Sequence, residues 1–75
     1  MNPQSRLVLL FESVSAAIVA EKVLKERGIP FKLIPVPKHL SSDCGVCIRI
    51  DGADRARVEE ALADKVKVAA VHPLP

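Results

Sequence analysis

Aromatic side chains are scarce in this 75-residue sequence, which has no Trp, no Tyr and two Phe. Its core must therefore be built mainly from Val, Ile, Leu and Ala, which suffice for a small two-layer fold. Proteins that bind nucleic acid combine base-stacking aromatics with clustered basic charge. The formal net charge here is only +2, so the composition argues against a nucleic-acid partner.

Long hydrophobic runs are missing as well. Glu12 interrupts the apolar run of residues 7–11 after five residues, whereas a membrane-spanning helix needs about 20. The run is also shorter than the apolar region of a usual secretory signal. We therefore expect no membrane association and a cytoplasmic location.

The length fits one domain, residues 1–75. Alternation and turn residues predict strands at 7–11, 31–36, 46–51 and 66–71, with 72–75 as a tail. They also predict a helix capped by Ser13 and stopped by Gly28, and a second helix capped by Asp54. The order β-α-β-β-α-β is that of the ferredoxin-like α+β fold, a two-layer sandwich with a four-stranded antiparallel sheet.

Alternation along the strands assigns apolar residues to both faces of this sheet. The face away from the helices is expected to be apolar with a basic fringe, and to carry Arg6, Val8, Leu10, Lys32, Ile34, Cys47, Arg49, Lys67, Ala69 and Val71. An uncovered apolar face in so small a protein indicates that something covers it. Homodimerisation is the simplest interpretation, and a surface for a dedicated partner or ligand is the alternative.

The segment from Ser41 to Cys47 carries the residues with chemical potential. In the predicted topology the loop between the second and third strands lies where the first helix begins, and a helix N-terminus favours a thiolate. This would activate Cys44, whereas the negative charge of Asp43 opposes it. Gly45 permits unusual backbone angles or the close approach of another molecule.

Ser41 and Ser42, in the same segment, would donate hydrogen bonds to a bound anion or persulfide. Ordinary turn formation explains the two serines equally well. With these residues the candidate site comprises Cys44 and Cys47 as reacting groups and Ser41, Ser42, Asp43 and Gly45 as binding groups.

Cys44 and Cys47 form a CxxC pair, which admits three interpretations. A thiol-disulfide pair requires the two sulfurs to meet, but alternation on a strand points them to opposite faces unless Gly45 introduces a bulge. A soft-metal site for Cu(I) or zinc would recruit His39 and Asp43 or a second chain. The third interpretation is a single nucleophilic or carrier cysteine, Cys44, with Cys47 as a resolving thiol or a plain strand residue.

A family resemblance bears on this choice. The sequence Leu-Ile-Pro-Val-Pro at residues 33–37, followed by Ser-Ser-Asp-Cys-Gly at 41–45, resembles the small bacterial selenium/sulfur carrier-like proteins. The preceding helix, with Ala-Glu-Lys-Val-Leu-Lys at 20–25 and Gly28-Ile29, fits the same family. The likeness extends from Leu7 to Ile50, and it implies a thiol, here Cys44, that accepts sulfur or selenium as a persulfide or selenopersulfide and passes it on.

We therefore expect a small carrier, or a partner-dependent transferase, with no cofactor and no resident metal. Its partners would be a cysteine desulfurase-type donor and a downstream acceptor protein. A soft-metal module, a thiol-disulfide module and a non-catalytic interaction or dimerisation domain are the alternatives.

Overall fold

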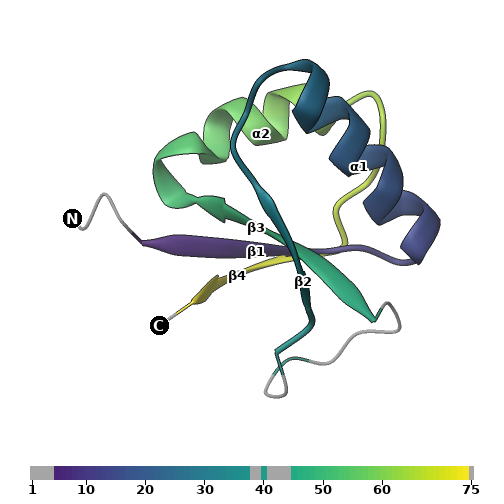
Figure 1. Ribbon diagram of the computed structural model, residues 1–75, viewed down its shortest axis with the longest axis vertical. Coiled ribbons are helices and arrows are strands. Elements are labelled where there is room, and N and C mark those ends of the chain that lie inside the picture. The colour runs from purple at the N-terminus through teal and green to yellow at the C-terminus, as the bar shows by residue number, and fades with distance from the viewer. Residues whose placement is uncertain (1–4, 38–39, 41–44, 75) are drawn as a thin grey trace.

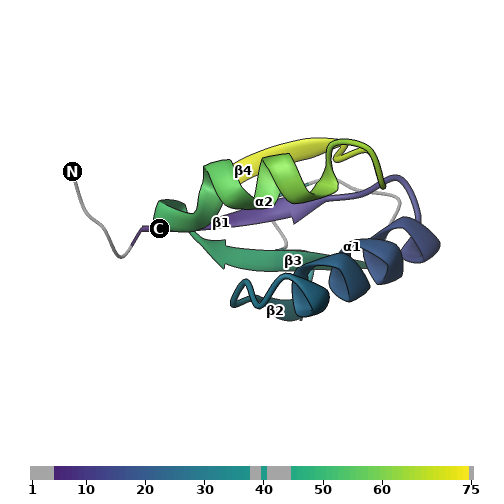
Figure 2. The same ribbon diagram turned by 90° about the horizontal axis from the view of Figure 1, so that it is seen from above.

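The computed structural model describes residues 5–37, 40 and 45–74. Its elements follow in the order β1 (Arg6–Leu10), α1 (Val14–Glu26), β2 (Lys32–Pro35), β3 (Val46–Asp51), a 3-10 turn (Gly52–Asp54), α2 (Arg55–Leu62) and β4 (Ala70–Leu74). The sheet has the strand order β2-β3-β1-β4, and all neighbouring strands are antiparallel. Both helices lie on one side of it (Figures 1 and 2). The predicted ferredoxin-like two-layer arrangement is confirmed.

The ends of α1 are set by local sequence, as predicted. The Ser13 hydroxyl accepts a hydrogen bond from the Ala16 backbone N–H at 3.1 Å, so it caps the first turn. At the other end Gly28 adopts φ 68°, the left-handed conformation that glycine tolerates best. The N–H groups of Gly28 and Ile29 then bond the carbonyls of Lys25 and Leu24. This paired pattern closes the helix and turns the chain toward β2.

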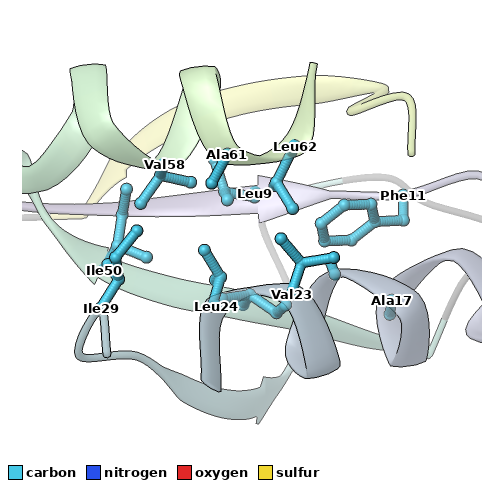
Figure 3. Packing of buried hydrophobic residues seen from close by; sticks show 12 residues of the cluster. Leu9, Phe11, Ala17, Val23, Leu24, Ile29, Ile50, Val58, Ala61 and Leu62 are labelled. Atoms are coloured by element: carbon cyan, nitrogen blue, oxygen red, sulfur yellow. The ribbon is translucent and has the colours of Figure 1, made fainter. Parts of the chain in front are cut away.

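The main hydrophobic core lies between the helices and the facing side of the sheet. Figure 3 shows side chains of α1 and α2 packed against residues of β1 and β3. Its buried members are Leu9, Phe11, Ala17, Ala20, Val23, Leu24, Ile29, Ile48, Ile50, Val58, Ala61 and Leu62. With so few aromatics, Phe11 is the largest of the fully buried side chains.

The start of α2 differs from the prediction in its capping. Asp54 occupies the N-cap position after the 3-10 turn, but its side chain makes no capping hydrogen bond. Its Oδ1 instead accepts a hydrogen bond from Arg57 Nη1 at 3.1 Å. The sequence located this helix start correctly, but the capping role of Asp54 was wrong because an arginine one turn ahead competes for the carboxylate.

The last strand was predicted at the wrong position. The expected strand at 66–71 and tail at 72–75 are replaced by β4 at Ala70–Leu74, which pairs along the whole of β1 from Leu10 to Arg6. Val66 and Val68 still pack against the main core, but they do so before the strand begins. The apolar residues of this loop have the spacing of a strand, but the position of β4 is determined by its pairing with β1.

The shift of β4 also changes which residues occupy each face. Ala70 packs on the side away from the helices and Val71 against the main core, the reverse of the expected assignment. The displacement therefore reverses the predicted inward and outward positions of this strand.

The sheet face away from the helices, here called the open face, has a small core of its own. Val8, Leu10 and Cys47 are almost fully buried there, and Ile34, Val36, Leu40, Ala70 and Leu74 pack around them. Val36 and Leu40 belong to the connection between β2 and β3. The chain itself thus covers the centre of a face that the sequence analysis took to be uncovered.

Among the described helices, none combines the length and the apolar character required to cross a membrane.

Candidate functional site

Strand register identifies the end of the sheet that carries the cysteine segment. In the antiparallel pair of β1 and β3, Leu9 is the partner of Ile48, so β3 begins beside the point where β1 ends. The chain continues from β1 into Ser13 and α1. Gly45, just before β3, and the start of α1 therefore lie at the same end of the sheet. Figure 1 shows the beginning of β3 and the beginning of α1 at this end. The topological expectation is confirmed for these described residues.

Four of the predicted site residues lie outside the described residues: Ser41, Ser42, Asp43 and Cys44. Their roles stay predictions. Gly45 and Cys47, together with the residues that precede the segment, are described and define its surroundings.

Gly45 is exposed. The expectation that it supplies unusual backbone angles stays a prediction, because its φ involves Cys44, which lies outside the described residues. The Gly45 carbonyl accepts the Val36 N–H at 3.4 Å, which extends the pairing of β2 and β3 past Pro35 and Val46. A Cβ built on Gly45 would meet no atom of the described residues within 4 Å. Among those residues, none fills the space beside the residue that follows Cys44.

Leu40 fixes the other end of the segment. Its N–H bonds the Pro37 carbonyl at 3.0 Å, and its half-buried side chain packs against the cluster of Val8, Leu10 and Cys47. Sequence reasoning missed this residue because the stretch around it is polar. Its apolar character among serines and a histidine was the available signal.

Cys47 lies in the interior of the open-face cluster. Its side chain has no exposed surface, and Sγ lies 3.8 Å from the Pro35 carbonyl oxygen, a weak hydrogen-bond geometry. Buried cysteines commonly act as small hydrophobic residues. In this conformation an external sulfur donor has no route to Cys47, so its described surroundings fit packing better than direct transfer.

The first turn of α1 offers a positive environment. It contains no acidic side chain, so the positive end of the helix dipole is not offset by a carboxylate of its own turn. Glu12, which is exposed, is the nearest acidic residue before the cap. At an exposed position close to this turn, an anion would be stabilised by about 0.3–1 kcal/mol.

The described part of the chain contains no group of three or more His, Cys, Asp or Glu side chains that could hold a metal ion. The proposed metal ligands His39, Asp43 and Cys44 fall outside that part. The metal alternative is therefore a matter for experiment.

Comparison with known families gives a match over nearly the whole chain. The model of the family described as "Putative Se/S carrier protein-like" matches residues 6–73, from β1 into β4. The chain belongs to this Se/S carrier protein-like family. Membership confirms the resemblance seen in the sequence and extends it over α2 and most of β4. The search of curated proteins and the search of solved structures found no match.

Proposed function

We propose that the protein carries sulfur or selenium as a persulfide or selenopersulfide on Cys44. The observation that carries this proposal is the position of Gly45, the residue after Cys44, at the sheet end where α1 begins. Family membership supports the kind of cargo. We place this activity in the cytoplasm, where cysteines remain reduced.

The proposed transfer is an exchange at sulfur that consumes no oxidant. The Cys44 thiolate attacks the outer sulfur of a donor persulfide, R–S–S–H, and forms a new S–S bond. The donor's S–S bond breaks, and the donor leaves as the thiolate R–S⁻. Cys44 then holds the persulfide, and attack by an acceptor thiolate on the outer sulfur repeats the step in the forward direction. A selenopersulfide would exchange in the same way.

Three features of the described residues support this assignment. The dipole of α1 favours an anionic sulfur at this end of the sheet. Among the described residues, none fills the space beside Gly45, which would let a donor approach. The burial of Cys47 leaves Cys44 as the better candidate of the two cysteines. We propose a cysteine desulfurase-type enzyme as donor and a second protein as acceptor.

Intact-mass measurement tests the proposal. After incubation with a cysteine desulfurase and cysteine, the protein should gain ~32 Da, the mass of one sulfur atom bound as a persulfide. Cys44→Ser should lose this gain and Cys47→Ser, if folded, should keep it. A wild-type protein that gains no sulfur, or a gain that persists in Cys44→Ser, contradicts the proposal.

A further inference from the structure

The end of the sheet opposite Gly45 carries a group of basic side chains on three adjacent strands. Lys32 of β2 is the partner of Arg49 of β3, and Arg6 of β1 is the partner of Asp51. Paired residues of antiparallel strands share a face, and Arg49 also pairs with the open-face residue Val8. Arg6, Lys32 and Arg49, here called the basic patch, therefore lie on the open face beside its apolar cluster.

The side chains of the basic patch are available for binding. Arg6 and Lys32 are exposed and Arg49 is half-buried. Within the described residues, the ion pairs are Arg55 with Glu59 and Arg57 with Asp54, so none of the three patch side chains forms an ion pair there. Asp51, the strand partner of Arg6, is the carboxylate beside the patch.

A pocket of about 270 Å³ joins the three residues. Its lining consists of Arg6, Pro30, Phe31, Lys32, Arg49, Ile50 and Asp51. Asp51 is the one acidic residue in this lining.

The basic patch accounts for the net charge of the whole chain. The sequence has eleven Lys and Arg against nine Asp and Glu. The pocket lining takes three of the basic residues and one acidic residue, so the rest of the chain balances at eight of each. A charge that is concentrated in this way on one face orients an approaching acidic partner.

We propose that the basic patch docks an acidic surface of the protein that exchanges sulfur or selenium with Cys44. This inference rests on the proposed function, because it assigns the patch to the same exchange. Arg49 lies four residues along β3 from Gly45, a separation of about 13 Å. A standard interface of about 800 Å² per partner is wide enough to reach both places. One partner would then contact the patch while its reactive group meets Cys44.

The patch fits a protein surface better than a small free oxyanion. Small-anion sites commonly use converging backbone N–H groups at a helix N-terminus. Here the donors are long side chains, two of them exposed, spread over three strands of a sheet. The pocket between them would accept a carboxylate side chain of the partner.

A peptide titration tests the charge recognition without any sulfur chemistry. Hexaglutamate is added to isotope-labelled protein at low salt, and backbone amide shifts are followed by NMR. We expect saturable shifts around Arg6, Lys32 and Arg49 that disappear in about 0.5 M NaCl, because salt screens exposed charges. The single variants Lys32→Glu and Arg6→Glu should each weaken them, and the matched single reversal Lys22→Glu on α1 should keep them.

Two outcomes of this titration overturn the proposal. One is the absence of shifts, or shifts spread over α1 and α2. The other is inorganic phosphate binding at the same amides more tightly than hexaglutamate, which would identify a small-oxyanion site instead.

A transfer experiment separates the docking from the proposed function. Sulfur loading is timed from a persulfidated cysteine desulfurase and from glutathione persulfide, a small donor that needs no docking surface. Reversal of Arg6 or of Lys32 should slow loading from the enzyme at least ~10-fold, the scale of electrostatic steering. Loading from the small donor, and both reactions of Lys22→Glu, should be unchanged.

Equal loading of the variants from the enzyme overturns the docking and leaves the carrier function standing. If neither donor loads the wild type, the carrier function fails. The docking at the exchange site then falls with it, and the peptide titration still decides whether the patch recognises acidic surfaces.

Discussion

Cys47 shows how far the surroundings of a residue can depart from what its motif suggests. The CxxC spacing made Cys47 a candidate resolving thiol, but Cys47 is buried in one cluster with Val8 and Leu10. Its burial depends on Leu40 and Val36, which come from the preceding connection and not from the motif itself. The sequence contained these residues, but their contact with β1 and β3 is long-range and no local pattern predicts it.

We expect Cys47 to be protected from alkylation in the folded protein. In the Cys44→Ser variant, iodoacetamide should react with Cys47 at least about a thousandfold more slowly in buffer than in concentrated guanidinium, because reaction requires unfolding. Mass spectrometry of timed samples measures both rates. Comparable rates in the two conditions would show that Cys47 is accessible and would restore it as a resolving thiol.

The capping residues were predictable to the extent that their partners are local. Ser13 and Gly28 act on the turn of α1 next to them, and both predictions are confirmed. Asp54 failed in its capping role because Arg57 offers a stronger, charged partner. The carbonyl of Gly45 continues the ladder of β2 and β3, and its conformational role stays a prediction.

At the scale of elements, β4 is the strand whose position is set by pairing with β1 and not by the local sequence pattern. Residues 66–68 alternate as in a strand and three apolar residues follow them, yet β4 begins at Ala70. The N–H of Ala69 bonds the Leu10 carbonyl at 2.8 Å, and pairing then continues to Arg6. The position of β4 is therefore determined by the length of β1 and by the register of their pairing. The first three strands were predictable because turn residues bound them closely, and the fourth was not.

The position of β4 makes the C-terminal residues structurally necessary. A chain that ends at Val71 loses His72, Pro73 and Leu74 from the edge of the sheet, and Leu74 no longer packs against Val8 and Leu10. We expect its free energy of unfolding to fall by at least ~2 kcal/mol, a large part of the total for a domain of this size.

Urea unfolding followed by circular dichroism measures this loss. A chain that ends at Leu74 retains all of β4 and serves as the control. If the two truncated chains have equal urea midpoints of unfolding, residues 72–74 contribute no stability and act as a tail.

On the scale of the whole molecule, the fold class followed from the order of elements alone, since short connections and alternating strands leave few arrangements. The order of elements does not fix the oligomeric state. The homodimer was expected because the open face was taken to be uncovered, and the structure buries the centre of that face within a single chain. Around that centre, the described residues of the face offer a partner the charge of Arg6, Lys32 and Arg49, together with half-buried apolar side chains such as Ile34 and Leu74.

Like charges that meet across a symmetric interface repel each other. We therefore expect light scattering at micromolar concentration to give the mass of one chain, with no dependence on concentration. A stable mass of two chains would contradict this expectation. In that case, loss of the dimer on Lys32→Glu but not on Lys22→Glu would locate the contact on the open face.

The attachment of the cysteine segment has a consequence for how this protein family can diversify. Leu40 is held by the open-face cluster and Gly45 by its bond to Val36, so the four intervening positions are tied at both ends to the sheet. The contacts that make both attachments come from residues outside those four positions. We therefore expect natural variation at the four positions to change the reactivity of the thiol more than the folding stability, and the same positions are where new chemistry could be introduced by engineering.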